Sequence, residues 1–248
     1  MLRNTCGLDL IRHNPYVTPV RAPQFAPAVL DCGGIEILKD PTFLASAQAV
    51  ASHTILDLPR LANLWMLSRI TNPTGAIIEV GTFRGGSARL LADACPDRNI
   101  FVCDTFQGFG DLPIDPKADE VFYREQFDQT SLAAVESLFV GDRHRVRLIQ
   151  GFFPASDRAN EVRDLSFAHL DVDLLQSMTD CLEYLESRFV PRSLIVLDDY
   201  RRSAHGVDQA AAQFVDRYPN WIALPVFPGQ GLLVHRSWFP SSQPNTFV

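Results

Sequence analysis

Short apolar runs alternate with helix-like segments along most of this chain, and that alternation limits the possible folds more than any other feature of the sequence. Five runs have the length and apolar content of buried strands: residues 76–80, 99–104, 145–151, 166–173 and 193–199. Segments with helical spacing of apolar residues lie between or after them: 85–95, 131–139, 177–189 and 207–218. This order predicts an α/β fold with a doubly wound, mostly parallel sheet. Two further β-like runs, 221–227 and 231–236, have no helix between them and predict a C-terminal antiparallel hairpin.

The N-terminal part of the chain follows a different pattern. Apolar residues spaced along 41–70 indicate two helices, with Asp40 or Thr42 as the cap of the first. Residues 1–40 are rich in proline and lack periodicity, which predicts an extended arm. We therefore expect an N-terminal arm and helical extension over 1–70, followed by the main α/β unit over 71–248.

Composition narrows the class of partner. The 248-residue chain carries 22 Lys and Arg against 29 Asp and Glu, a formal net charge of −7, and its basic residues are scattered. We therefore expect neither nucleic acid nor a membrane surface as a partner. No apolar run reaches the roughly 18 residues that span a bilayer, and the N-terminus lacks the apolar stretch of a signal peptide. The five cysteines form no C-x-x-C pair, so we expect reduced thiols in a cytoplasmic protein.

A glycine-rich turn follows the first predicted strand, in the sequence EVGTFRGGS from Glu79 to Ser87. Gly81 lets the backbone turn sharply at the strand end, and Gly85 lets a ligand or a helix approach closely. Asp104 ends the next strand, 23 residues after Gly81, where a carboxylate can accept hydrogen bonds from both hydroxyls of a ribose. Together these residues predict a nucleoside ligand. A tight turn without a ligand and a solvated aspartate are the alternatives.

Four aspartates end the last two predicted parallel strands: Asp171 and Asp173 on one, Asp198 and Asp199 on the other. Because the carboxyl ends of parallel strands line a common crevice, we expect the four side chains to converge. Such a cluster is unfavourable unless a cation neutralises it or protons are retained. Oxygen ligands favour Mg²⁺, Mn²⁺ or Ca²⁺, and no Cys/His set supports zinc. The alternative is that some of these acids cap helices, as Asp173 is placed to do for 174–189.

Histidines are few, and two of them have contrasting expected roles. His205 lies in the loop after the second acidic pair, near the predicted mouth of the crevice, where it can accept a proton from a hydroxyl. A surface histidine without function is the alternative. His169 lies inside the fourth predicted strand and is expected to be a core residue.

Four segments resemble the macrocin O-methyltransferase family: IIEVGTFRGGSARLL, VCDTFQGF, HLDVDLLQSMTDCLEYL and LIVLDDYRRSAHGVDQAAAQF. The similarity runs from about residue 50 to 235. It implies a Rossmann-like class I methyltransferase domain over 71–248 that binds S-adenosylmethionine (SAM). The implied reaction is a metal-dependent transfer of the methyl group to a hydroxyl of a small molecule, such as a sugar or natural-product intermediate. The chain departs from the family where it has Leu175 instead of a tyrosine, and Pro191-Arg192-Ser193 instead of a glycine pair.

Carried over position by position, the resemblance implies a SAM pocket. Its residues would be Glu79, Val80, Gly81, Thr82, Gly85, Ser87, Asp104, Thr105, Gly151, Phe152 and Asp171. Asp104 would hold the ribose, and Gly151 and Phe152 would border the adenine.

The resemblance also implies roles for the acids. Asp171, Asp198 and Asp199 would bind the metal, most simply Mg²⁺, with Asp173 as an alternative or additional ligand. The ion would hold substrate oxygens and favour the deprotonated hydroxyl. Asp173 and His205 are the candidates for accepting the proton.

Two alternatives to this function stay open at this point. One is a metal-independent methyltransferase, and the other is a non-catalytic SAM- or nucleotide-binding protein. The retained acids Asp171, Asp198 and Asp199 argue against the second, because binding alone does not need them. We also expect a homodimer, since the proline-rich arm and the helical extension offer apolar surface beyond the core sheet.

Overall fold

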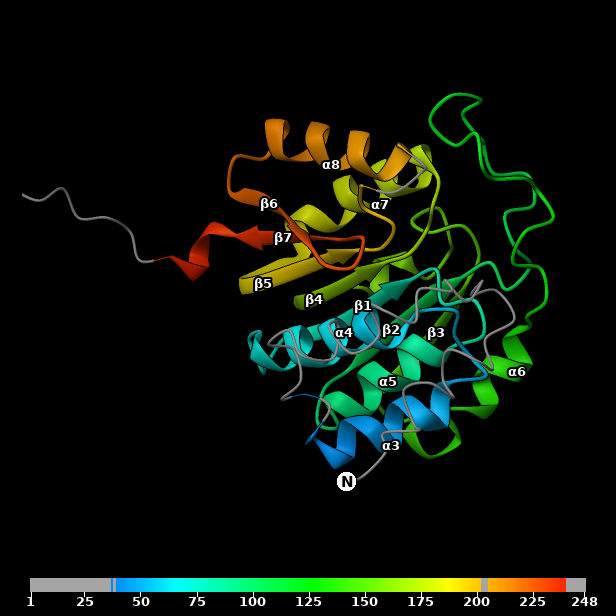
Figure 1. The fold of residues 1–248 in the computed structure, drawn as a ribbon, viewed down its shortest axis with the longest axis vertical. Helices are drawn as coiled ribbons and strands as arrows, with labels where there is room; N and C mark the ends of the chain where they lie inside the picture. The colour runs from blue at the N-terminus through cyan, green and yellow to red at the C-terminus, as the bar shows by residue number, and fades with distance from the viewer. Residues whose placement is uncertain (1–36, 38, 202–204, 240–248) are drawn as a thin grey trace, which may run out of the picture.

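One seven-stranded sheet runs through the molecule in the order β3-β2-β1-β4-β5-β7-β6 (Figure 1). The structure, a computed structural model, describes residues 37, 39–201 and 205–239. The strands are β1 (Ala76–Val80), β2 (Ile100–Asp104), β3 (Val146–Gln150), β4 (Leu165–Leu170), β5 (Phe189–Leu197), β6 (Trp221–Val226) and β7 (Gln230–His235). Strands β1 to β5 pair in parallel, whereas β7 is antiparallel to β5 and β6. The predicted mostly parallel sheet with a C-terminal hairpin is confirmed.

Helices cover both faces of the sheet. They are α3 (Pro41–Val50), α4 (Leu58–Ile70), α5 (Gly86–Ala94), α6 (Leu132–Ser137), α7 (Leu175–Leu185) and α8 (Gly206–Arg217), with single 3₁₀ turns at Val140–Asp142, Ala159–Glu161, Glu186–Arg188 and Arg236–Trp238. Helices α3, α4 and α5 lie on one face, and α7 and α8 on the other (Figure 1). Ile77 packs with the first group and Ile78 with the second, because successive strand residues point to opposite faces. Covered faces explain why these strands are continuously apolar.

The two helices predicted before the sheet are present and share its core. Asp40 caps α3, since its carboxylate accepts hydrogen bonds from the backbone N–H groups of Thr42 at 2.8 Å and Phe43 at 3.3 Å. Phe43 and Trp65 are almost fully buried, with their ring centroids 5.7 Å apart. The extended arm predicted for residues 1–40 lies almost entirely outside the described residues. None of the described helices combines the length and apolar character that crossing a membrane requires.

The direction in which the chain winds reverses between β1 and β4. From β1 the chain moves outward to β2 and β3, then returns to β4 on the other side of β1. A crevice forms at the carboxyl ends of the strands at such a switch point. The Gly81 N–H donates to the Cys103 carbonyl and the Asp171 N–H donates to the Val80 carbonyl, both at 2.9 Å. The residues that follow β1 and β4 therefore lie side by side at the crevice.

Strands β4 and β5 differ from the prediction at their ends. Strand β4 ends at Leu170 and β5 ends at Leu197, so the four acids lie in turns beyond the strands. Strand β5 also begins earlier than predicted, at Phe189, and its pairing with β4 contains an irregularity. Arg192 belongs to the Pro191-Arg192-Ser193 segment in which the chain departs from the resemblance, and its φ is +65°. Its guanidinium lies 4.8 Å from the Trp238 ring centroid, a contact that accompanies the left-handed backbone.

Arg98 ties three elements together at the amino ends of the strands. Its Nε donates to the Gly75 carbonyl at 2.7 Å, and its Nη1 donates to the Ser68 carbonyl at 2.8 Å and to the Thr71 hydroxyl at 3.0 Å. Its Nη2 donates to the Ser166 hydroxyl. The end of α4 and the starts of β1 and β4 are thus held by one buried guanidinium.

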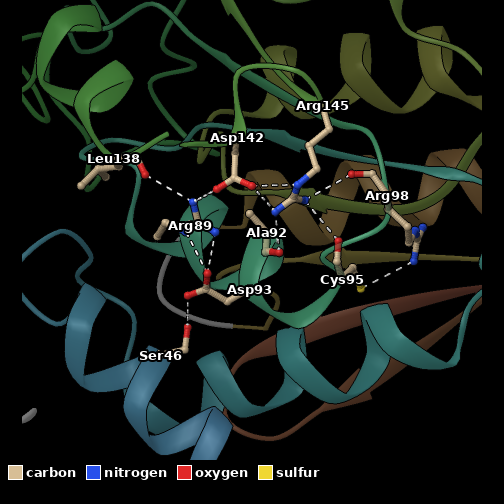
Figure 2. A network of polar contacts seen from close by, with 9 residues as sticks. All are labelled: Ser46, Arg89, Ala92, Asp93, Cys95, Arg98, Leu138, Asp142 and Arg145. Atoms are coloured by element: carbon tan, nitrogen blue, oxygen red, sulfur yellow. Dashed lines mark hydrogen bonds and ion pairs between the residues drawn. The ribbon is translucent and has the colours of Figure 1, made fainter. Parts of the chain in front are cut away.

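A neighbouring network holds the C-terminal end of α5 (Figure 2). Arg145 donates to the carbonyls of Ala92 at 3.1 Å and Cys95 at 3.2 Å. These carbonyls have no partner within the helix, and their partial negative charge favours a cation. Asp142 in turn accepts hydrogen bonds from both Arg145 and Arg89. Arginines therefore fasten the helical layer to the sheet at the amino ends of the strands, opposite the crevice.

We expect Arg98→Met to lower the free energy of unfolding by about 3 kcal/mol, because it leaves several buried oxygens without a donor. Urea denaturation followed by circular dichroism measures this change. Arg217→Met is the control, since Arg217 and its partner Glu183 are both exposed and pair at 2.6 Å on the surface. The control is expected to change stability by less than about 0.5 kcal/mol. Equal losses in the two variants would contradict the role of Arg98.

Candidate functional site

A cleft opens at the switch point, between the loops that follow β1 to β5 and the segment before α4. Twelve of the site residues predicted from the sequence line this cleft: Val80, Gly81, Thr82, Ser87, Asp104, Thr105, Gly151, Phe152, Asp171, Asp173, Asp198 and Asp199. Glu79, Gly85 and His205 are outside it. The structure therefore brings the glycine turn and all four acids into one cavity.

The glycine turn is held against the loop that follows β4. Gly81 has a φ of +83°, and a Cβ on it would lie 1.9 Å from the Asp171 carbonyl oxygen. Beyond it, the N–H groups of Thr82 and Phe83 donate to Asp104 Oδ2 at 2.7 and 2.9 Å. Phe83 has a φ of +52°, a left-handed conformation that these bonds help to maintain. The conformation of the turn is thus fixed by the contact of Gly81 with the Asp171 backbone and by the hydrogen bonds to the Asp104 carboxylate.

Asp104 is engaged by the protein's own backbone. Besides the two bonds to the glycine turn, its Oδ1 accepts a hydrogen bond from the Phe106 N–H at 2.7 Å. Burial raises the pKa of Asp104, and the three backbone bonds oppose that effect only in part. Asp104 lines the cleft, and its contacts within the chain organise the turn.

Glu79 supports the turn from behind the cleft. It is fully buried, accepts a hydrogen bond from the Thr82 hydroxyl at 2.5 Å and lies 2.7 Å from Nδ1 of His169. His169 is itself fully buried, as expected of a core residue. Glu79 therefore positions a cleft residue instead of facing the cavity.

Gly85 and His205 also lie outside the cleft lining. A Cβ on Gly85 would lie 2.8 Å from Cγ1 of Val135, so this glycine permits close packing of α5 against α6. His205 is exposed at the start of α8, and its backbone N–H donates to the Ala118 carbonyl at 3.1 Å. Of the two proton acceptors named from the sequence, only Asp173 faces the cavity.

The four acids line the same cleft, in an arrangement that costs free energy. Asp173 and Asp198 are buried, and Asp171 and Asp199 are partly exposed at the cleft. Asp173 and Asp199 have φ values of +59° and +54°. Residues with such a strained left-handed backbone are common at functional sites. Burial, together with repulsion from the neighbouring acids, raises the pKa of Asp171 and of Asp173 well above the usual range.

Asp173 does not cap α7, contrary to the alternative considered from the sequence. The N-cap of α7 is Leu174, which makes no side-chain capping bond. The Leu175 N–H donates instead to Asp119 Oδ1 at 3.0 Å. Asp119 is fully buried and comes from the connection after β2, a role that no local pattern around it indicated.

Arg60 is the principal site residue that the sequence did not indicate. It lies in the first turn of α4 and reaches into the acid cluster. Its Nη1 donates to Asp198 Oδ2 and, at 3.2 Å, to Asp199 Oδ1. Gln230 on β7 donates to the other oxygen of Asp198 at 3.0 Å and accepts a hydrogen bond from Asn63 of α4 at 2.9 Å. Helix α4 thus contributes directly to the site.

Carboxylate oxygens are the donors that hard divalent metals prefer, and one guanidinium offsets part of the charge of the four acids that line the cleft. Among the residues that the structure describes, no three His, Cys, Asp or Glu side chains lie close enough together to hold an ion. Arg60 lies at two of the predicted ligands, Asp198 and Asp199, in this arrangement.

An aromatic wall completes the cleft. It is formed by Phe109, Phe122 and Phe127 from the connection after β2, together with Phe83. Phe109 meets Phe122 and Phe127 edge to face, with centroids 5.8 and 5.4 Å apart. The connection over residues 105–130 therefore contributes to the cavity, and its Ala118–Asp119 segment is hydrogen-bonded to the starts of α7 and α8.

The parallel sheet, the glycine turn at its switch point and the adjoining acidic cleft define a class I SAM-dependent methyltransferase. The chain belongs to the macrocin-O-methyltransferase (TylF) family, whose sequence model matches residues 46–225. It is an O-methyltransferase by that membership, and the relatives named below carry the same activity in their names.

Two characterised relatives cover most of this chain. Mycinamicin III 3''-O-methyltransferase of Micromonospora griseorubida is 31% identical over 205 residues, which are 75% of this chain and 79% of the relative. A tetracenomycin-C rhamnosyl 4'-O-methyltransferase of Streptomyces olivaceus is 28% identical over 176 residues, 65% of this chain and 67% of the relative.

Solved structures share the fold. The O-methyltransferase NovP aligns with a TM-score of 0.64 at 21% identity, covering 74% of this chain and 82% of NovP. The calicheamicin methyltransferase CalS11 aligns with a TM-score of 0.60 at 19% identity, covering 86% of this chain and 93% of CalS11.

We expect Gly81→Ala to abolish SAM binding and to destabilise the protein, because its Cβ would collide with the Asp171 backbone. Isothermal calorimetry with SAM and a thermal melt measure the two effects. Gly141→Ala is the control, since a Cβ there meets nothing within 4 Å. Undiminished SAM binding by Gly81→Ala would show that the turn is not the cofactor site.

Asp173→Asn is expected to stabilise the metal-free protein at pH 8, by about 1 kcal/mol or more. The pKa of Asp173 is raised in the folded state, so ionising this group with rising pH costs folding free energy. Below the ordinary pKa of 3.8 the carboxyl is protonated in both states, and the advantage of the variant disappears. Urea unfolding in EDTA at pH 8 and at about pH 3 checks the sign. Asp157→Asn, at an exposed position, is the control, and a pH-independent gain would refute the explanation.

Proposed function

We propose that this enzyme transfers the methyl group of SAM to a hydroxyl of a sugar or a related natural-product intermediate, with Mg²⁺ held by the cleft acids. The observation that carries the proposal is the convergence of Asp171, Asp173, Asp198 and Asp199 beside the glycine turn in one cavity. The names of the relatives, which act on mycinamicin and on a rhamnosyl tetracenomycin, support the acceptor class.

The cofactor would lie along the glycine turn. SAM supplies a methyl group activated by a sulfonium, and the acidic cleft favours that positive charge. The bare backbone at Gly81 permits close approach, and Thr82 is positioned by its bond to Glu79. Asp104 and Gly151 both line the cleft, where they would contact the ribose and the adenine respectively. Each of these residues lies at or close to the carboxyl end of a strand, so the sheet holds the pocket.

The acids would hold the metal and accept the proton. Asp171, Asp198 and Asp199 are the proposed ligands, with Asp173 as an additional one. A bound divalent ion orients substrate oxygens and favours the deprotonated hydroxyl. Asp173 is a better proton acceptor than His205, because it lines the cleft and burial raises its pKa.

The residues around the acceptor would contribute mainly by orienting its hydroxyl toward the methyl group. As the hydroxyl oxygen bonds to the methyl carbon, the carbon–sulfur bond breaks in line and the hydroxyl proton passes to the carboxylate. Phe109, Phe122 and Phe127 provide an apolar wall for the acceptor and exclude water from that side. The homodimer and the cytoplasmic location stay predictions from the sequence.

A direct assay incubates the protein with SAM, Mg²⁺ and a panel of glycosylated natural products that includes mycinamicin III, and follows the added methyl group by mass spectrometry. EDTA is expected to abolish transfer, and added Mg²⁺ to restore it. Failure to bind SAM at high micromolar concentration would refute the proposal. Transfer that is unaffected by EDTA would favour a metal-independent methyltransferase.

Asp199→Ala is expected to lower kcat by about 100-fold or more, as the loss of a metal ligand does. Its SAM affinity is expected to stay within about threefold, because Asp199 follows β5 and is not part of the glycine turn after β1. Steady-state kinetics and calorimetry measure the two quantities. Asp157→Ala, at an exposed position, is the control. An Asp199→Ala enzyme with full activity would remove this residue from the mechanism.

A further inference from the structure

A buried serine hydroxyl in the lining of the cleft has no partner within the described chain. Ser177 lines the cleft, is 8% exposed and lies in the first turn of α7. Its Oγ makes no hydrogen bond with any of the described residues. A hydroxyl withdrawn from water without a partner costs free energy, so buried hydroxyls are normally hydrogen-bonded. An unpaired hydroxyl in the lining of a cleft therefore points to a polar atom of a bound ligand.

The start of α7 sets the kind of ligand that this hydroxyl can meet. Leu174 is the N-cap and makes no side-chain capping bond, and Asp119 accepts the N–H of Leu175. The N–H groups at this end of a helix carry partial positive charge, which favours an atom with a lone pair. Asp173 belongs to the same lining and repels an anion such as a carboxylate. The site therefore suits a neutral group that accepts hydrogen bonds.

Ser177 lies on the side of α7 that packs against the loop after β3. Residues four and seven positions apart share one face of a helix, so Ser177 shares a face with Cys181 and Tyr184. The Cys181 thiol donates to the Phe153 carbonyl at 3.8 Å, and the Tyr184 ring meets the Phe153 ring edge to face, with centroids 5.4 Å apart. Phe153 lines the cleft together with Ser177. The hydroxyl thus belongs to the part of the cleft that this loop borders.

That part of the cleft adjoins the residue proposed to hold the ribose. The Gly151 N–H donates to the backbone carbonyl of Asp104 at 2.9 Å, so the loop after β3 begins directly beside Asp104. Phe152 follows in the lining and is 41% exposed, which offers an apolar surface to a planar ring. With the ribose at Asp104, the group that continues toward Phe152 and Phe153 is the base of the nucleoside.

We propose that the Ser177 hydroxyl hydrogen-bonds to the adenine of SAM and selects this base. Adenine is neutral, its ring nitrogens accept hydrogen bonds and its amino group donates them, and a serine hydroxyl can do either. Phe152 and Phe153 pack against the ring, and Ser177 fixes its orientation. The inference rests on the binding of SAM in the cleft that is given under the proposed function, and it does not depend on a metal.

Calorimetry of the full-length protein in EDTA with three ligands tests the proposal. S-adenosylhomocysteine (SAH) is the product that SAM leaves, methylthioadenosine lacks its amino acid, and S-ribosylhomocysteine lacks its base. Ser177→Ala is expected to bind SAH and methylthioadenosine about five- to tenfold less tightly, as the loss of one buried hydrogen bond does. Its affinity for S-ribosylhomocysteine is expected to stay within about twofold, because that ligand has no base to contact the hydroxyl.

Thr179→Val is the matched control on the same helix. The Thr179 hydroxyl donates to the Leu175 carbonyl at 2.8 Å, within the helix, and Thr179 is not part of the cleft lining. Its removal is expected to change the SAH affinity by less than about twofold, because this bond serves only the helix. Equal losses of SAH affinity in the two variants would overturn the proposal.

Thermal melts separate a role in binding from a structural one. Because the hydroxyl has no partner in the described chain, Ser177→Ala without ligand is expected to melt at the same temperature as the unaltered protein or above it. SAH at a fixed concentration is expected to raise the melting temperature of the variant by less. A variant that melts lower without ligand and binds SAH normally would show a structural serine, against the proposal.

The ligand panel also keeps this inference distinct from the proposed function. If Ser177→Ala binds SAH as tightly as the unaltered protein does, the inference fails and the proposed function stands. A loss that S-ribosylhomocysteine shares, or that methylthioadenosine lacks, places the hydroxyl at the ribose or the amino acid and also overturns it. If the unaltered protein does not bind SAH, the proposed function and the inference fail together.

Discussion

The close contact between the backbone after β1 and the backbone after β4 is the constraint on which the site depends. Only a glycine fits at position 81, because the Cβ of any other residue would overlap with the Asp171 carbonyl oxygen. That contact places the cofactor turn and the first acid side by side, at the point where the sheet reverses its winding. Asp104 then braces the turn from the neighbouring strand by accepting two of its N–H groups.

Concentrated negative charge is the second constraint, and the protein offsets it in part with its own side chains. Burial raises the pKa of Asp171 and of Asp173, so ionising them costs free energy, and Asp173 and Asp199 add backbone strain. Arg60 and Gln230 bring partial compensation from α4 and β7, elements far apart in the sequence. Functional residues often lower the stability of the folded protein, because their arrangement serves activity. The arginine-rich edge at the opposite ends of the strands is, by contrast, fully hydrogen-bonded and serves stability.

Much of the fold could be predicted from the sequence because both faces of the sheet are covered. Residues such as Ile77 and Ile78 are apolar on both sides of the strand, which makes each strand a continuous apolar run. Strand ends were less predictable. Apolar content continues through Val172, but the turn that begins at Asp171 ends β4 at Leu170. The convergence of the four acids was predictable, since it follows from the parallel order of the strands alone.

The sequence by itself determined the alternation of strands and helices, the glycine at the switch point and the placement of acids at strand ends, because each depends on local backbone geometry or on residue type. The tertiary structure alone decided which charges meet. Arg60 lies 138 residues from Asp198 and Asp119 lies 56 residues from Leu175. It also decided that Glu79 is buried behind the cleft, that Gly85 packs against α6 and that His205 lies outside the cleft lining. Such long-range pairings depend on how helices dock on the sheet, and no periodicity or spacing within a segment records that.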